Sequence, residues 1–228
     1  MKRSPAQEYV IANGERFLEE LEALTRIPSV STDPAHGEDM TRATDWLKKR
    51  MEKAGLQGVE VAPTAGHPVV YGEWMGAGVH APTVLLYAHY DVQPASLADG
   101  WKTEPFTPTR KDGKIFARGV GDDKLHSVMI IQVAEAFLES GEMPPVNIKL
   151  VIEGEEEIAS PNFVPWIQEN RQRLKADCVL ICDGGVKSPE KPTIVYGLRG
   201  ALGMEFTVQG PSTDLHSGLY GGCVHNPA

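Results

Sequence analysis

The sequence RGVGDDK, residues 118–124, ends a glycine-rich turn with two adjacent aspartates, directly before an apolar helical pattern. Other reactive side chains follow apolar runs that have the pattern of buried strands: His89 and Asp91 follow one run, residues 155–157 a second and Asp183 a third. In an open α/β sheet, the carboxyl ends of parallel strands converge on one crevice, so residues far apart in sequence can meet there. We therefore expect these side chains to form one site.

A metal centre is the chemistry that this cluster predicts. Carboxylates gathered in one place repel one another and resist desolvation unless cations neutralise them. Imidazole mixed with carboxylate ligands is typical of catalytic zinc sites. Our interpretation is that Asp122 bridges metal ions.

Each motif also has a plainer interpretation. The HYD of residues 89–91 is consistent with a hydrogen-bonded histidine at a strand end, and the aspartates 122–123 with a helix N-cap. The glutamates 155–157 are consistent with a solvated charged loop, and Asp183 before two glycines with turn chemistry. The conjunction favours the metal centre, because four successive strand ends each carry a potential ligand or base.

Composition limits the classes of function. The chain has 228 residues, 41% of them hydrophobic, which is enough for a sizeable core. A formal net charge of -9 argues against nucleic-acid partners, because phosphate neutralisation requires clustered Lys and Arg, and small-molecule or peptide substrates fit better. No run approaches the roughly 20 apolar residues of a membrane span. Cys178, Cys182 and Cys223 have no CxxC spacing and cannot all pair, which predicts a reducing, cytoplasmic location.

Hydrophobic periodicity predicts helices alternating with strands. Helices are expected at residues 4–26, 38–54, 125–138 and 162–174. Strands are expected at residues 59–61, 69–74, 83–88, 114–116, 146–152 and 177–182. The runs 83–88 and 177–182 have the continuous apolar character of strands buried on both faces. An α/β fold with helices on both sides of a mixed sheet follows.

The pattern changes near residue 198. Residues 204–208 alternate like a half-exposed antiparallel strand. We therefore expect a first domain at residues 1–197 and the beginning of a second at residues 198–228. Residues 226–228, Asn-Pro-Ala, resemble a helix start, so the chain is expected to stop where a helix should begin.

The ordered set of motifs resembles one family, the dinuclear zinc peptidases of the carnosinase and cytosolic dipeptidase group. This family also contains aminoacylase, acetylornithine deacetylase and succinyl-diaminopimelate desuccinylase. The resemblance covers nearly the whole chain and implies a zinc-peptidase catalytic domain with a mixed, largely parallel sheet, followed by an inserted α+β lid and dimerisation domain. The motifs are HYDVQP (89–94), GDDK (121–124), EGEEE (153–157), CDGG (182–185), YGLRG (196–200) and DLHSGLYGG (214–222).

The resemblance also implies a ligand set for two Zn²⁺ ions, with Mn²⁺ or Co²⁺ as alternatives. His89 and Asp183 are implied to bind one ion, and Asp122 to bridge it to the second. Glu157 is implied to bind that second ion. The peptide bond between Asp122 and Asp123 is implied to be cis.

Catalytic roles follow from the same resemblance. Glu156 is implied to be the general base, and Asp91 to orient His89. His216, in the lid, is implied to reach the active site of the partner subunit in a homodimer and to help stabilise the tetrahedral oxyanion.

The implied function is metal-dependent hydrolysis of the amide bond of dipeptides or short peptides. The alternative enzymatic function is removal of the acyl group from small N-acyl amino acids. The alternative without catalysis is an inactive fragment of such an enzyme. Two departures from the family pattern matter here. Leu125 stands where relatives commonly have glycine, and the last histidine ligand and the groups that bind the substrate carboxylate are expected beyond residue 228. The 228-residue form is therefore expected to be inactive.

Overall fold

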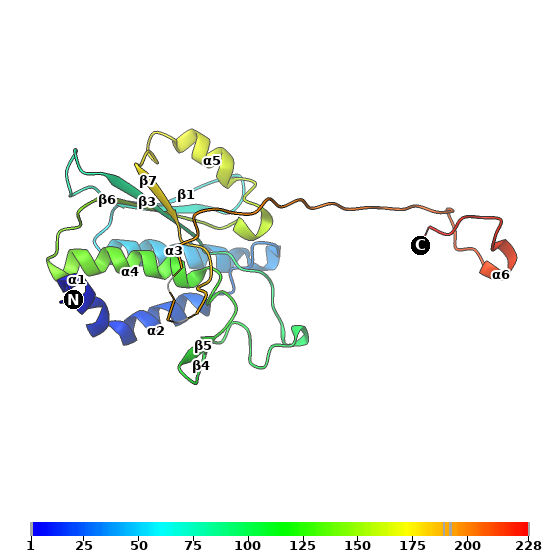
Figure 1. The fold of residues 1–228 in the computed structure, drawn as a ribbon, viewed down its shortest axis with the longest axis horizontal. Helices are drawn as coiled ribbons and strands as arrows, with labels where there is room; N and C mark the ends of the chain where they lie inside the picture. Colours follow the sequence, from blue (N-terminus) through cyan, green and yellow to red (C-terminus); the bar gives the residue numbers. More distant parts are fainter. Residues whose placement is uncertain (1, 189, 192, 228) are drawn as a thin grey trace. The chain divides into compact units, whose positions relative to one another are not determined.

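The computed structural model describes residues 2–188, 190–191 and 193–227. The chain divides into two compact units, Met1–Gly185 (unit 1) and Val186–Ala228 (unit 2). Unit 1 has a mixed sheet with helices on both faces (Figure 1). Its helices are α1 (Pro5–Ala12), α2 (Gly14–Thr25), α3 (Gly37–Lys53), α4 (Lys124–Ser140) and α5 (Phe163–Asn170), with the short 3-10 helices η1 (Pro34–His36), η2 (Leu97–Asp99) and η3 (Glu156–Ile158). Its strands are β1 (Gln57–Ala62), β2 (Val69–Trp74), β3 (Thr83–His89), β6 (Asn147–Glu153) and β7 (Cys178–Ile181) in the sheet, and β4 (Thr109–Lys111) and β5 (Lys114–Phe116) in a separate hairpin.

The five-stranded sheet has the order β1-β2-β6-β3-β7. β3 runs parallel to β6 and β7, whereas β2 is antiparallel to β1 and β6. The register pairs His89 with Glu153 and Tyr87 with Ile181, so β3, β6 and β7 end at the same edge of the sheet. The predicted α/β class with a mixed sheet is confirmed.

Two apolar layers hold the helices on the sheet. α3 and α4 cover one face and α5 covers the other (Figure 1). Helical spacing on α3 places an apolar stripe against the sheet, as predicted. This stripe consists of Met40, Ala43, Leu47 and Met51, all 2% exposed or less. Among the described residues, no helix is long and apolar enough to cross a bilayer.

The predicted first helix is two helices rather than one. Ser4 begins α1 with the predicted capping box, in which its hydroxyl accepts a hydrogen bond from the Gln7 amide. The helix is interrupted at Asn13, where the side-chain amide donates to the Tyr9 carbonyl at 2.9 Å. Asn favours such local side-chain bonds over helix continuation, and Gly14 adds a weak helix former, so the Asn-Gly pair overrides the apolar periodicity.

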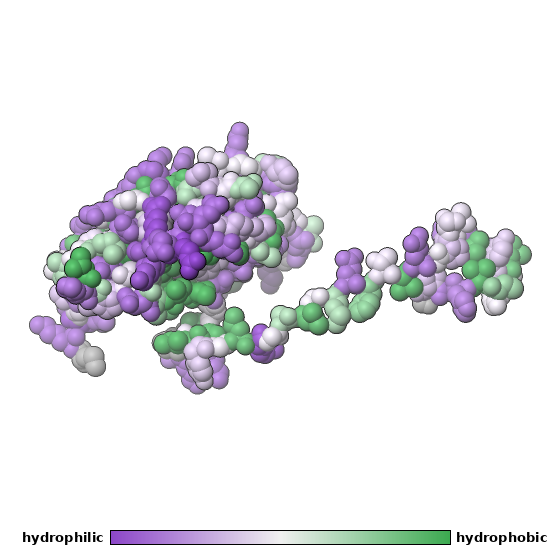
Figure 2. All heavy atoms as spheres, turned by 90° about the horizontal axis from the view of Figure 1, so that it is seen from above, coloured by the Kyte–Doolittle hydropathy of each residue, from purple (hydrophilic) through white to green (hydrophobic). Residues whose placement is uncertain are grey.

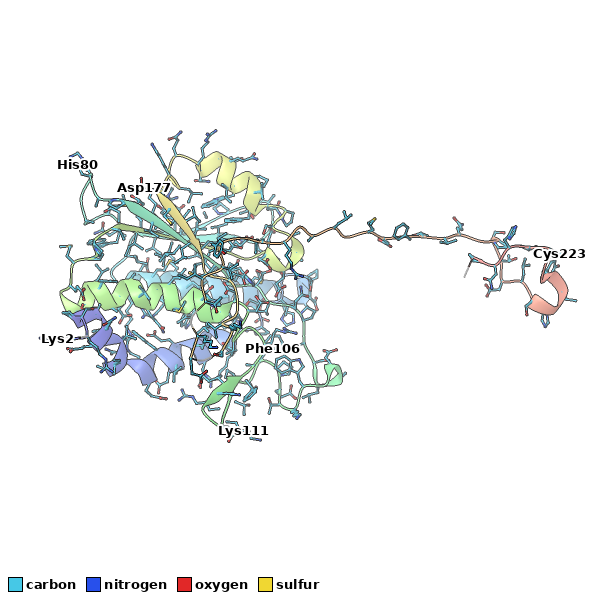
Figure 3. All side chains as sticks on the ribbon, in the orientation of Figure 1. Lys2, His80, Phe106, Lys111, Asp177 and Cys223 are labelled. Carbon is cyan, nitrogen blue, oxygen red and sulfur yellow. The ribbon has the colours of Figure 1, made fainter. Side chains whose placement is uncertain are left out.

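The prediction that β7 is buried on both faces is wrong. All four of its residues are exposed, with Val179, Leu180 and Ile181 at 56%, 49% and 65%. β7 lies at the end of the strand order and pairs with β3 alone among the described strands. Its beginning is held by Asp177 (Figure 3), whose carboxylate accepts a hydrogen bond from the Thr83 amide at 2.8 Å. An apolar run therefore identified the strand but not its neighbours.

Lys124, the first residue of α4, is completely buried. Its ammonium donates to the carbonyls of Leu24 and Ile27, at and just beyond the end of α2, and burial lowers its pKa to about 7. Lys124 therefore connects the start of α4 to the end of α2, directly after the turn that carries Asp122.

The Lys124→Met substitution is expected to lower the free energy of unfolding by about 1–3 kcal/mol, because it removes two hydrogen bonds worth about 0.5–1.5 kcal/mol each. Urea denaturation followed by circular dichroism measures the change. Lys111→Met is the control, because Lys111 is exposed on the β4–β5 hairpin (Figure 3). Equal stability of the two variants would contradict a stabilising role for the buried amine.

Unit 2 contains one short helix, α6 (Ser217–Tyr220), among its described residues. The strand predicted at residues 204–208 is not formed, because no other described segment pairs with it, and a strand without a partner leaves its backbone groups unbonded. Phe206 of this segment is 81% exposed. Figure 2 shows hydrophobic residues in green at the surface. The domain boundary near residue 198 stays a prediction.

Candidate metal centre

His89 ends β3 with its imidazole fully buried. Its Nδ1 lies 3.0 Å from the Asp91 carbonyl oxygen and 3.2 Å from Asp91 Oδ1. Both are acceptors, so Nδ1 donates its proton to Asp91, and Nε2 is the nitrogen that a metal would bind. The contact expected between Asp91 and His89 is therefore present, and it turns Nε2 toward the carboxylates at the sheet edge.

Three carboxylates surround His89 Nε2. It lies 3.1 Å from Asp122 Oδ1, 3.9 Å from Asp183 Oδ2 and 3.9 Å from Glu156 Oε2. One ligand atom each of His89, Asp122 and Asp183 lie within 4.8 Å of one another. The side chains of Asp122 and Asp183 are 63% and 29% exposed, so the group opens to solvent on the side away from the imidazole.

Asp122 reaches this group from the turn before α4, not from a sheet strand. The run at residues 114–116 does form a strand, β5, but it pairs only with β4 outside the main sheet. Three of the four expected strand ends thus belong to the sheet, and a helix start supplies the fourth group. The peptide bond between Asp122 and Asp123 is cis, as the resemblance implied.

Asp123 fixes the backbone of His89 through its carboxylate. Its carboxylate is fully buried, and Oδ2 accepts a hydrogen bond from the His89 amide at 2.9 Å. Oδ1 is paired with Nδ1 of His126 on the first turn of α4. Ser127 donates its hydroxyl proton to the His89 carbonyl at 2.7 Å. The start of α4 therefore fixes the end of β3 as well as carrying Asp122.

Asp91 joins His89 to the glutamates that follow β6. Its Oδ1 accepts a hydrogen bond from the Glu156 amide at 3.2 Å, and its Oδ2 accepts one from the Glu157 amide at 3.1 Å. The Ser31 hydroxyl also donates to Oδ2, at 2.7 Å. One buried carboxylate thus sets the position of the imidazole and of the turn that carries both glutamates.

The charges of the site favour a bound cation. Burial alone lowers the pKa of His89, but its hydrogen bond to Asp91 and the charges of Asp91, Asp123 and Glu156 outweigh burial and raise that pKa to about 10. Burial also raises the pKa of the carboxyls of Asp123 and Glu156. The raised pKa of His89 marks a concentration of negative charge around the imidazole, which a divalent cation would compensate.

The donor set fits a divalent metal. A lone pair on imidazole nitrogen and two carboxylates are the ligands of catalytic zinc and similar ions, and three protein ligands leave a position for water or substrate. The carboxylate–imidazole contact through Asp91 is the outer support that such histidines usually have. His89, Asp122 and Asp183 could therefore hold one ion.

The structure treats the other predicted residues differently. Glu156 lies beside the three-residue group. Glu157 is the next residue of η3, but within the described part of the chain its carboxylate does not join that group. His216 belongs to unit 2, where its Nδ1 accepts the Gly218 amide at 3.0 Å at the start of α6. Its predicted role remains a prediction.

Sequence reasoning did not assign the contacts of four side chains that shape the site. Gln93 was visible only as a letter of HYDVQP. Ser31 lies in a segment without periodic signal, and His126 lies in a predicted helix but outside its apolar pattern. Asp123 was recognised only as the neighbour of Asp122. These four residues touch the backbone or carboxylates of the predicted ligands and supports: Gln93 to Glu157, Ser31 to Asp91, His126 to Asp123 and Asp123 to His89.

Sequence comparison finds dipeptidases among the relatives. Cys-Gly metallodipeptidase dug1 of Schizosaccharomyces pombe is 38% identical over 226 residues, which are 93% of this chain and 47% of that protein. Beta-Ala-His dipeptidase of Homo sapiens is 38% identical over 162 residues, covering 70% of this chain and 32% of that protein. The chain spans about half the length, or less, of these curated relatives.

Structure comparison agrees. The di-peptidase Dug1p from Saccharomyces cerevisiae matches with a TM-score of 0.80 at 30% identity, over 98% of this chain and 50% of that chain. Human carnosine dipeptidase 1 matches with a TM-score of 0.80 at 29% identity, over 97% and 49%. The family described as Peptidase family M20/M25/M40 matches residues 85–220, which include every residue of the proposed centre. Because this match covers more than half of the chain, the protein belongs to peptidase family M20/M25/M40.

Proposed function

We propose that the protein is a metal-dependent dipeptidase that hydrolyses the amide bond of dipeptides or short peptides. Membership of a metallopeptidase family implies the use of a divalent metal. The observation that carries the proposal is the convergence of His89 Nε2, Asp122 and Asp183 beside the carboxylate of Glu156. The relatives named as Cys-Gly and Beta-Ala-His dipeptidases support dipeptides as the substrate class.

The proposed cofactor is a pair of Zn²⁺ ions, with Mn²⁺ or Co²⁺ as alternatives. His89, Asp122 and Asp183 would hold one ion, and Asp122 and Glu157 would contribute to the second. The mixed imidazole and carboxylate donors favour zinc over the hard cations Mg²⁺ and Ca²⁺. When bound, the ions would polarise the scissile carbonyl as Lewis acids and lower the pKa of water.

Glu156 is the proposed general base. Burial raises its pKa, and the charges of Asp183 and Glu157 add to the increase against the opposing effect of His89. A raised pKa brings a carboxyl closer to the operating pH, where general acid–base catalysis is most efficient. Glu156 would take the proton of the attacking water and return it to the leaving amine. Its backbone is held by Asp91, and its side chain is 40% exposed.

The remaining expectations extend the proposal to the whole protein. We propose a catalytic domain at residues 1–197 and the beginning of a lid and dimerisation domain at residues 198–228. A homodimer would let His216 reach the active site of the partner subunit. The unpaired Cys178, Cys182 and Cys223 are consistent with a cytoplasmic location.

A substrate comparison tests the reaction class. The full-length protein, loaded with Zn²⁺, Mn²⁺ or Co²⁺, would be assayed with Cys-Gly and β-Ala-His and, separately, with N-acetyl amino acids. The expected result is faster hydrolysis of at least one dipeptide than of every N-acetyl amino acid. Preferential hydrolysis of the N-acetyl compounds would assign the protein to the deacylase branch, and no hydrolysis of either class with any metal would contradict an enzymatic function.

A further inference from the structure

Gln93 makes two hydrogen bonds to a single residue, the proposed metal ligand Glu157. It follows β3 by four residues and is half-buried. Its side-chain Nε2 lies 2.8 Å from Glu157 Oε2 and 3.2 Å from the Glu157 carbonyl oxygen. The amide nitrogen therefore donates to Glu157 at both its carboxylate and its backbone carbonyl.

The segment around Gln93 is itself fixed to the core of unit 1. The Val92 amide donates to the Ser29 carbonyl at 3.0 Å, and Val92 is fully buried. Asp91 accepts the Glu157 amide, so residues 91–93 hold Glu157 at its nitrogen, its carbonyl oxygen and its carboxylate. Within residues 91–93, Gln93 is the residue that donates to the Glu157 carboxylate. A residue held at two backbone atoms and at its carboxylate loses little further entropy when that carboxylate binds a ligand.

The chemistry of the contact suits a ligand that must keep its charge. An amide donor satisfies a carboxylate oxygen without neutralising it, whereas Arg or Lys would pair with the negative charge and compete with a cation. Gln93 uses Oε2, and in the described part of the chain no hydrogen bond to Glu157 Oε1 is present. Oε1 is therefore the oxygen available for a metal.

We propose that Gln93 is a positioning residue for the second divalent metal, because it orients the Glu157 carboxylate so that Oε1 is the coordinating atom. This inference rests on the proposed two-metal function. It assigns a role in metal binding to a neutral residue that is itself neither a ligand nor a base. Outer partners of metal ligands typically contribute about 10- to 100-fold in metal affinity.

Two substitutions test the proposal in the full-length protein. Gln93→Met keeps the length of the side chain and removes both donors, and Gln93→Arg keeps donors but adds a positive charge. Both are expected to lower the affinity for the second ion by about 10- to 100-fold. The affinity for the first ion, held by His89, Asp122 and Asp183, is expected to stay unchanged. A purely structural bracing role would make Gln93→Arg resemble the parent, so this variant separates charge from bracing.

Gln132→Met is the matched control. Gln132 on α4 is also half-buried, and its Nε2 donates to one carbonyl and one carboxylate, at 3.1 Å to Phe17 O and 3.0 Å to Glu20 Oε2. The Gln132→Met variant therefore loses one hydrogen bond to a carbonyl and one to a carboxylate, as Gln93→Met does, but away from the proposed metal centre. Its metal affinities are expected to match those of the parent.

The readout is stepwise binding of Mn²⁺ and Zn²⁺, by calorimetry with a competing chelator and by electron paramagnetic resonance of free Mn²⁺. The Gln93 inference would be overturned if Gln93→Met bound the second ion with an affinity within about twofold of the parent's. It would also be overturned if the parent bound one ion only. The same conclusion would follow if Gln93→Arg bound the second ion as tightly as the parent does, because a neutral donor would then be unnecessary for binding that ion. A parent that binds no ion at all would instead contradict the proposed function, so the two failures are distinguishable.

Discussion

The Glu156→Gln variant of the full-length protein is expected to lose about 10²- to 10⁴-fold of its turnover while retaining its bound metal, because a general base contributes about that factor and is not a ligand. Glutamine has the same shape and cannot accept the proton of water. The side chain lies 3.9 Å from His89 Nε2, close to the metal donors but outside the group formed by His89, Asp122 and Asp183. Turnover of Cys-Gly and elemental analysis of the purified variant measure the two effects.

Two further variants make this result specific. Glu169→Gln changes an exposed glutamate of α5 and is expected to have parental turnover. Glu157→Ala is expected to lower the metal content, since Glu157 is the proposed ligand. Turnover of Glu156→Gln within about tenfold of the parent would contradict the general-base role. A full metal content in Glu157→Ala, together with loss of metal in Glu156→Ala, would exchange the roles of the two glutamates.

The fold could be predicted from sequence wherever burial imposed a period on the chain. α3, β2, β3 and α4 were all placed within two residues of their observed limits, because each buries an apolar face or run. Local chemistry was also informative: the capping box at Ser4 was identified from residue types alone.

Predictions failed where neighbours decide the structure. β7 has the apolar sequence of a buried strand, yet it is exposed at the sheet edge. Residues 204–208 alternate like a strand but have no partner within the described part of the chain. A strand is stabilised by pairing, and the identity of the partner is not written in the strand itself.

The site was predictable as a set of charged groups, but not as a network. The strand-end pattern predicted that His89 and Asp183 would meet, and the parallel register of β3, β6 and β7 explains why they do. The contacts that orient these groups come from neutral or hidden side chains. Gln93 and Ser31 act through hydrogen bonds whose partners lie about 60 residues away, which no local pattern encodes.

The polypeptide of residues 1–228 is expected to bind one divalent metal firmly and a second only weakly. His89, Asp122 and Asp183 supply three donors within 4.8 Å of one another, which is enough for a catalytic-type site. The second ion would have Asp122 and Glu157 alone among the residues that the resemblance identifies, and two protein ligands are usually too few for tight binding. With one firm ion, no dipeptide hydrolysis is expected from this polypeptide.

Removal of the imidazole should abolish the firm site. His89→Ala is expected to lower the affinity for the first ion by more than about 100-fold, because it leaves only two carboxylates as donors. This loss is larger than the loss typical of removing an outer partner of a ligand. His80→Ala is the control, since His80 is exposed on a loop away from the sheet edge (Figure 3). Zinc titration by calorimetry, beside a Cys-Gly assay, measures both variants. Two firm sites in the 228-residue polypeptide, or dipeptide turnover by it, would show that these residues hold a complete centre and that the proposed ligand set is wrong.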